Sequence, residues 1–225
     1  MRALSKPPKR LFGMQGVVHR LRNRRAALTL VVGLLVTGCT HAIPLNATVQ
    51  PPPDIAPVPL AVGVHYTPEF ETYVHSESRR GDTWAFPLGS ASVKLFDDTF
   101  SAAFKSIRNV PRRPPLGAGE SGLAAVIESR IEGFSFTLPF LKTGTYTAEI
   151  TYRFTIYSPQ GDPFASWMET GWGEKKGQMG FEYARWPGEA ADIAMQDAAA
   201  KFLRNFRTVP EVRRWLRERG ALPAG

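Results

Sequence analysis

The stretch TYTAEITYRFTIYS, residues 145–158, carries the clearest structural signal in the chain, because its side chains alternate in character. One alternating set is apolar or aromatic, and the other consists mostly of threonines and charged residues. A repeat of two residues is the period of a β-strand with one face in a core and the other in water. We therefore predict a half-buried antiparallel strand, whose buried set is Tyr146, Ala148, Ile150, Tyr152, Phe154 and Ile156.

Strands are also predicted on both sides of this stretch. Residues 123–138 are rich in β-branched and aromatic residues, and Gly133 stands where a bulge would fit. A turn at residues 141–144 leads from this segment into residues 145–158. A second turn, SPQGD at residues 158–162, leads on to residues 164–172 as the hairpin partner. The sequence therefore predicts a three-stranded antiparallel meander.

Shorter extended segments are predicted earlier in the chain. Residues 60–66, LAVGVHY, alternate like a strand, and residues 70–75 and 83–86 are two further extended pieces. The sequence Arg80-Gly81-Asp82 between them is interpreted as a turn.

An amphipathic helix is predicted over residues 90–108, SASVKLFDDTFSAAFKSIR, with Ser90 or Ser92 as its N-cap. Its apolar residues recur at spacings of three and four, which places them on one helix face. This face is expected to pack on the sheet as core. The alternative is that it lines a ligand site, whose candidate residues are Phe96, Phe100 and Phe104.

Two helices are predicted at the C-terminal end. Residues 189–206 form an Ala-rich helix with a stripe of small and aromatic residues, and Thr208–Glu211 resembles a capping box that opens a short helix to about Arg219. Antiparallel strands between segregated helices predict an α+β fold. We expect a two-layer sandwich, with the meander sheet packed by the amphipathic helix and the Ala-rich helix.

The positive charge of the chain lies in its N-terminal segment. Residues 1–38 hold eight of the 28 Lys and Arg residues and none of the 20 Asp and Glu residues, so 20 of each sign remain from residue 39 onward. A chain without residues 1–38 would be neutral. No nucleic-acid partner is therefore expected.

An apolar run from Ala26 to about Thr37 follows the basic residues. It is shorter than the roughly 20 residues that span a bilayer, but it has the length of the apolar region of a signal peptide. It ends in Val36-Thr37-Gly38-Cys39, which resembles a bacterial lipobox and contains the only cysteine of the chain.

The lipobox resemblance implies that residues 1–38 are a lipoprotein signal peptide. It also implies that Cys39 is the lipidation site, with a diacylglyceryl group on its thiol and a fatty acid, such as palmitate, on its new N-terminus. Thr40, rather than Asp, follows the cysteine, which favours the outer membrane. Translation from Met14 in place of Met1 would give a more ordinary signal peptide.

Residues 39–59 are predicted to be a tether from the lipidated Cys39. Six prolines fall between residues 44 and 59, and such a segment favours extended polyproline conformation. Residues 60–225 are expected to form a single α+β domain, which is long enough for a substantial core.

The chemistry-bearing residues match no catalytic or metal-binding motif. His41, His65 and His75 lack the spacing of a metal site, and no nucleophile motif occurs. The remaining option is a glycosidase-like pair, with Glu149 and Glu169 facing each other across the hairpin. We expect solvated surface charges instead, so no catalytic residue, metal or cofactor is predicted.

Aromatic residues gather in the hairpin end and the Gly-rich segment after it, which is expected to be flexible. Aromatic side chains anchor many protein interfaces, so these residues form a candidate interaction surface. The alternative is that they fold back over the sheet as a second small core. The residues are Trp167, Trp172, Phe181, Tyr183 and Trp186.

Taken together, these features resemble the small α+β outer-membrane lipoproteins of the Gram-negative envelope, of the LptE-like and YajG-like types. The resemblance rests on the lipobox, the Pro-rich segment, the helix at residues 90–108, the strands around YTAEITYRFTIYSPQGD and the helix AADIAMQDAAAKFLRNF. It implies a non-catalytic, periplasm-facing accessory that serves assembly or transport by contacting an envelope protein complex. The alternatives are an amphiphile- or glycolipid-binding module and a cell-wall hydrolase.

Overall fold

The computed structural model describes residues 40–49, 56–117, 119, 122–141, 143–177 and 184–222. These residues belong to one compact unit, residues 40–225. The predictions for Cys39, Phe181 and Tyr183 lie outside the described residues. Among the helices that are described, none has the length and apolar character to cross a membrane.

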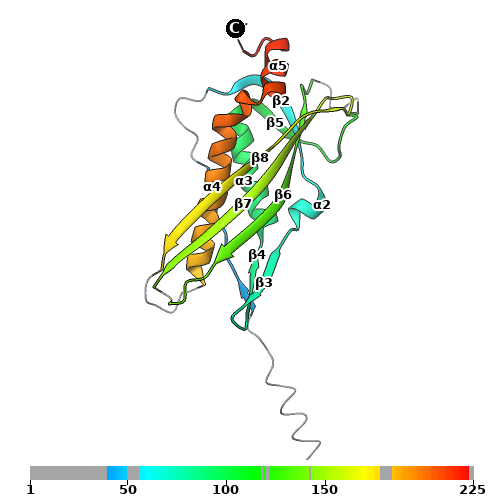
Figure 1. Ribbon diagram of the computed structural model, residues 1–225. Helices are drawn as coiled ribbons and strands as arrows, with labels where there is room; N and C mark the ends of the chain where they lie inside the picture. Colours follow the sequence, from blue (N-terminus) through cyan, green and yellow to red (C-terminus); the bar gives the residue numbers. More distant parts are fainter. Residues whose placement is uncertain are drawn as a thin grey trace, which may run out of the picture. The chain divides into compact units, whose positions relative to one another are not determined.

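The described part of the unit contains two sheets and four α-helices, of which α2 is a single short turn (Figure 1). The larger sheet has the order β5-β2-β6-β7-β8, and the smaller has the order β1-β4-β3. The strands are β1 Thr40–Ala42, β2 Val58–His65, β3 His75–Arg79, β4 Asp82–Phe86, β5 Phe104–Asn109, β6 Val126–Thr137, β7 Thr145–Tyr157 and β8 Pro163–Lys176. The helices are α2 Pro68–Glu71, α3 Leu88–Ala103, α4 Arg185–Asn205 and α5 Pro210–Glu218.

The predicted meander is confirmed in strands β6, β7 and β8, which pair antiparallel in that order. The β6–β7 register shifts between Ile131 and Gly133, where the bulge was expected. The alternation in β7 is also confirmed, because the six predicted side chains from Tyr146 to Ile156 are all 2% exposed or less.

The larger sheet contains two strands besides the meander, so it is mixed rather than wholly antiparallel as predicted. Strand β2 pairs in parallel with β6 on one side and with β5 on the other, so β5 is the edge strand. Residues 104–108 were expected to end the amphipathic helix, but α3 ends at Ala103 and Phe104 has extended backbone, with φ −128° and ψ 154°. Phe104 and Ile107 are three residues apart, a spacing that fits a helix. Pairing with β2 decides the outcome instead.

Helices α3 and α4 contact each other and cover one face of the larger sheet, while α2 lies beside α3 and β6. The expected two-layer α+β arrangement is confirmed. The predicted caps are not used: α3 begins after Pro87, so Ser90 and Ser92 lie inside it. Helix α5 follows Val209, and the Thr208 hydroxyl donates to the carbonyl oxygen of Asn205 instead of capping α5.

Helix α4 approaches β8 closely because two glycines of the strand face it. A Cβ atom on Gly171 would lie 1.9 Å from the Ala194 carbonyl oxygen, and one on Gly173 would lie 2.0 Å from that of Ala190. The Gly-rich segment expected to be flexible therefore begins inside a strand. Its first glycine, Gly173, is a packing residue.

The N-terminal part of the predicted tether belongs to the folded unit. Strand β1 pairs in parallel with β4, and the Ile43 amide donates to the Ala85 carbonyl oxygen at 2.9 Å. Ile43 and Ala47 are buried, and the Asn46 amide donates to Asp192 Oδ1 on α4 at 2.8 Å. The prediction of a spacer is therefore wrong for residues 40–49, because apolar residues between the prolines give this segment something to bury.

A second local difference concerns residues 70–75, which were expected to be extended. Pro68–Glu71 form the short helix α2, and the Thr67 hydroxyl caps it by accepting from the Phe70 amide. Strand β3 begins only at His75. The turn between β3 and β4 is confirmed, with positive φ at both Arg80 and Gly81.

Candidate functional site

The predicted ligand-lining residues of α3 and β5 lie in the aromatic core. Phe96 and Phe100 have no exposed surface, and Phe104 is 1% exposed. Phe96 contacts the ring of Tyr152 edge-on at 4.7 Å between centroids, and Phe104 lies 5.4 Å from Phe206. None of the three pockets described below includes these rings. The three rings therefore act as core residues that pack the helices on the sheet, and they line none of these three pockets.

The three tryptophans of the predicted interaction surface are separated by the strand geometry. Trp167 faces the helices and stacks on Phe202 at 5.7 Å, whereas Trp172 is 50% exposed on the opposite face of β8. Trp186 is partly buried at the start of α4 beneath the guanidinium of Arg185. The structure therefore places these residues at three different sites and leaves Trp172 as the exposed one.

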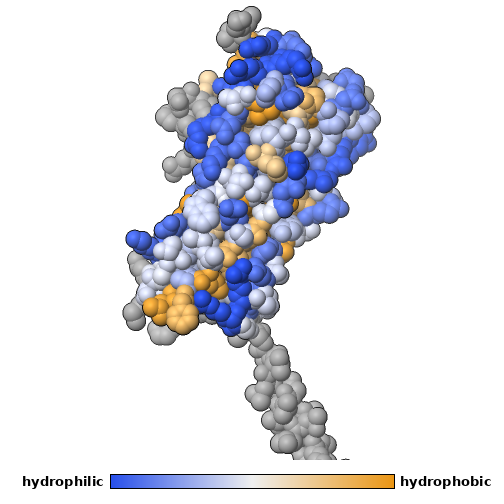
Figure 2. Space-filling model, viewed as in Figure 1, coloured by the Kyte–Doolittle hydropathy of each residue, from blue (hydrophilic) through white to orange (hydrophobic). Residues whose placement is uncertain are grey.

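The face of β6, β7 and β8 that points away from the helices is called the open face below. Trp172 and Met168, 54% exposed, are its two large apolar side chains on β8. Hydroxyl side chains surround them, so this face is mostly pale in the hydropathy view (Figure 2). Its residues are Ser135, Thr137, Thr147, Glu149, Thr151, Arg153, Thr155, Ser166, Met168, Thr170, Trp172 and Glu174.

Cross-strand contacts link the side chains of the open face. Thr151 and Thr170 hydroxyls lie 2.8 Å apart, and such cross-strand pairs stabilise a sheet locally. Arg153 donates through Nε to Glu132 Oε1 at 2.6 Å and through Nη2 to the Met168 sulfur at 3.4 Å. The arginine is thereby fixed next to Met168. Met168 was missed in the sequence, although it shares the even-numbered alternation of Trp172.

Side chains from α4 occupy part of the outer edge of β8. Asp197 Oδ2 accepts from the Trp172 amide at 3.0 Å, and Lys201 Nζ donates to the Thr170 carbonyl oxygen at 2.7 Å. The two side chains also form an ion pair at 2.8 Å. An edge strand with free backbone groups is a template for pairing with another strand, so this pair protects the middle of β8.

The suggested catalytic carboxylates do not face each other. Glu149 lies on the open face opposite Trp172, whereas Glu169 lies opposite Tyr152 on the helix face and is 8% exposed. Burial raises the pKa of Glu169, although the Asn205 amide donates to both of its oxygens at 3.3 Å. The two residues are therefore on opposite sides of the sheet and cannot act on one glycosidic bond.

Two of the histidines make contacts with nearby backbone or aromatic groups. His65 Nδ1 donates to the Val110 carbonyl oxygen at 3.1 Å, and His75 contacts the ring of Phe134 at 5.0 Å between centroids. Within the described ranges, no three His, Cys, Asp or Glu side chains come together as a metal site would require.

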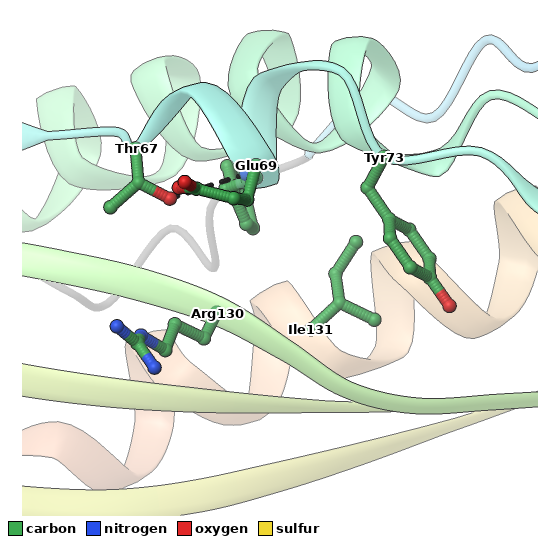
Figure 3. Close-up of a pocket in the computed structure, with 6 residues that line it drawn as sticks. Thr67, Glu69, Tyr73, Arg130 and Ile131 are labelled. Carbon is green, nitrogen blue, oxygen red and sulfur yellow. Dashed lines mark hydrogen bonds between the residues drawn. The ribbon is translucent and has the colours of Figure 1, made fainter.

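A pocket of about 240 Å³ lies between α2 and β6 (Figure 3). Figure 3 shows Glu69 beside Thr67 on the α2 side, with Arg130 across from them and Tyr73 and Ile131 at the other end. Arg130 also bonds Glu128, so its charge is already shared. This pocket offers one carboxylate, Glu69, and one guanidinium, Arg130.

Glu128 lies next to this pocket as a buried charge, 2% exposed. Burial disfavours its ionised form, but hydrogen bonds and charge attraction from Arg113, and then from Arg130, outweigh that effect and lower its pKa. Arg113 bonds both of its oxygens through Nε and Nη2. The arrangement is structural, because it ties the loop after β5 to the start of β6.

Two further pockets lie at other positions on the unit. One, of about 230 Å³, lies between the β3–β4 turn and the end of β6, and its lining includes Arg80, Trp84 and Tyr146. The other, of about 280 Å³, lies between the β7–β8 turn and α5, and its lining includes Phe164 and Trp215.

No protein-family model matches the sequence, and no curated protein matches it. Several solved structures resemble the fold at low identity. Protein XCC0632 from Xanthomonas campestris, described as a DUF330 protein, has a TM-score of 0.46 at 14% identity over 74% of this chain and 93% of its own. A minor lipoprotein from Acinetobacter baumannii has a TM-score of 0.41 at 11% identity over 66% and 91%, respectively.

Lipoprotein GNA1162 from Neisseria meningitidis has a TM-score of 0.31 at 9% identity, over 56% of this chain and 90% of its own. Two of these three structures are described as bacterial lipoproteins, and an LptE or YajG type is not shown for this chain. At these scores the likeness assigns no function to the chain.

Proposed function

We propose that this chain is a lipid-anchored lipoprotein of the outer membrane, facing the periplasm, that acts as a non-catalytic accessory by binding another envelope protein. The open face is the proposed binding surface. The observation that carries the proposal is the pair of exposed apolar side chains, Met168 and Trp172, on an otherwise hydrophilic face.

The composition of the open face fits a protein partner. Trp, Met and Arg are enriched in protein interfaces, and Arg153 is held beside Met168 by Glu132. A partner side chain packed over Trp172 would remove its aromatic surface from water. Buried aromatic side chains of this kind contribute much of the binding energy of protein interfaces. The surrounding hydroxyls and the Arg153–Glu132 pair would form the polar rim.

The anchor part of the proposal rests on the lipobox and on where the folded unit begins. Cys39 directly precedes Thr40, the first residue of β1, so acylation of Cys39 would attach lipid one residue from the sheet. Such a protein works close to its membrane, with little free tether. A partner that reaches the open face would therefore be a membrane protein or a protein held near the membrane.

The binding surface can be tested by site-specific photocrosslinking in intact cells. We expect a crosslinkable residue at position 172 or 168 to capture one dominant envelope protein. The matched control is Ile193, which is 37% exposed on α4 on the other side of the sheet, and it should capture much less. Equal capture from positions 172 and 193, or none from either, would contradict the proposed surface.

A substitution series makes the same test quantitative. Trp172→Ala should weaken capture from position 168 by about tenfold or more, because a central interface Trp typically contributes 2 kcal/mol or more. Trp186→Ala, at a partly buried site away from the open face, should leave capture unchanged. If position 168 captures no protein even when Trp172 is present, and a lipid co-purifies with the chain, the alternative of an amphiphile-binding module is favoured.

A further inference from the structure

We propose that the β6–β7 turn is a membrane-contacting tip, in which Phe140 and Leu141 insert into the surface of the bilayer that holds the lipid on Cys39. The inference rests on the proposed lipid anchor and adds a second, noncovalent contact with the same membrane.

The tip is the most exposed apolar feature among the described residues. Phe140 is 89% exposed and Leu141 is 65% exposed, and the two are consecutive in the chain. Next to these two residues, the Gly144 amide donates to the Leu141 carbonyl oxygen at 2.9 Å. A single exposed apolar residue needs no explanation, but two adjacent ones at one end of the unit form a small surface that can insert into a bilayer.

Arg80 fixes the tip against the β3–β4 turn. Its guanidinium donates to the carbonyl oxygens of Leu138 at 3.2 Å and Pro139 at 2.7 Å, and it lies 5.8 Å from the centroid of the Phe140 ring. The pocket between Arg80 and Pro139 also lies at this junction. The two turns therefore form one end of the unit.

The chain leaves toward Cys39 from this same end. Strand β1 runs parallel to β4 with Thr40 opposite Thr83, and Thr83 is only two residues after Gly81 in the β3–β4 turn. Cys39 is the residue before Thr40, and consecutive Cα atoms are about 3.8 Å apart. The proposed lipid attachment therefore lies at the end of the unit that carries Phe140 and Leu141. In Figure 2, apolar side chains gather at the lower left, at the end of the unit where β6 and β7 meet in Figure 1.

Lipid at Cys39 makes the second contact effectively intramolecular. Apolar side chains lower their free energy when they leave water for the bilayer interface, and an anchored domain presents them at a high local concentration. Insertion of the tip would then orient the unit. The β7–β8 turn and α5, which lie at the other end of β7, would point away from the membrane, and the open face would be directed sideways.

The experiment uses the full lipidated protein in vesicles of phosphatidylethanolamine and phosphatidylglycerol. The only native cysteine, Cys39, is acylated in the proposed form, so a new cysteine can be labelled alone with an environment-sensitive fluorophore. Phe140→Cys places the label at the tip. Gln160→Cys places it in the exposed β7–β8 turn at the opposite end. Quenching by lipids that carry a spin label near the headgroup reports contact.

We expect quenching at position 140 to exceed that at position 160 by about fivefold or more, as for a residue in the acyl–headgroup boundary. Adding Leu141→Asp to the position 140 variant should remove most of the quenching. The matched control is Val74→Asp, which removes another exposed apolar side chain, 50% exposed, at the far end of β3. That change should leave the quenching intact.

Equal quenching at positions 140 and 160, or no effect of Leu141→Asp, would overturn the membrane tip. Mass spectrometry of the same sample separates the two proposals. An unacylated Cys39 means that the lipid anchor has failed, whereas an acylated Cys39 with an unquenched tip refutes only the tip. Thermal unfolding of each variant confirms that the exposed substitutions have not unfolded the chain.

Discussion

Single residues in this protein show how burial and pairing set charge. Glu128 and Glu169 are both buried carboxylates, but their pKa values move in opposite directions. Burial disfavours ionisation at both, and only Glu128 has two guanidinium groups that outweigh it. The opposite pKa shifts could not be predicted from the sequence, because Arg113 reaches Glu128 from a loop whose path depends on the whole fold.

Asp192 on α4 provides the residue-level prediction. Burial raises its pKa to about 6, opposed by the hydrogen bond from the Asn46 amide. The ordinary value is 3.8, so between these values the folded chain holds a proton that the unfolded chain has lost. The contribution of Asp192 to the free energy of unfolding must therefore fall as pH rises from about 4 to about 6 and then level off.

Asp192→Asn keeps an oxygen acceptor for the Asn46 amide but cannot ionise. Its stability relative to wild type should rise as pH increases from 4 to 7, measured as the difference in Tm at each pH. Asp98→Asn, which removes an exposed charge on α3, controls for net charge. A difference for Asp192→Asn that is the same at pH 4 and pH 7 would contradict this account.

Among the helices and strands, those whose sequence has a clear local pattern were predicted correctly. Strand β7 followed from alternation, and α4 followed from its stripe of Ala and Phe. Strand β5 was missed because its pairing with β2 joins residues about 45 positions apart. The separation of Trp167 from Trp172 could have been predicted, since residues five apart in a strand point to opposite faces. No prediction covered Phe140, and Leu141 was only assigned to the turn at residues 141–144.

The close packing of α4 on β8 predicts that a larger side chain at Gly171 lowers stability. Gly171→Ala would place a Cβ atom 1.9 Å from the Ala194 carbonyl oxygen and 2.7 Å from the Ala198 amide nitrogen. Both contacts are with helix backbone, so α4 must shift, at a cost of about 1–3 kcal/mol or more. Chemical denaturation should show this loss of unfolding free energy.

Gly133→Ala is the matched control, because a Cβ atom there meets nothing within 4 Å. Its stability should stay within about 0.5 kcal/mol of wild type, as for an ordinary surface substitution. If both variants lost equal stability, the close approach of α4 to Gly171 would not explain the glycine-rich end of β8.

For the whole molecule, the proposals depend on the residue at which the mature chain begins. The folded unit starts at Thr40, so a processed chain beginning at Cys39 would have its lipid beside β1, the tip at the membrane and the open face available to a partner. A retained N-terminal segment would place eight basic residues and an apolar run there instead.

Intact-mass and N-terminal peptide mass spectrometry of the protein purified from the membrane fraction distinguishes these forms. We expect a chain that begins at Cys39 and carries a diacylglyceryl group and an N-linked acyl chain. We expect a Cys39→Ala variant to keep residues 1–38. A chain that begins elsewhere, or one with a free Cys39 thiol, would contradict it.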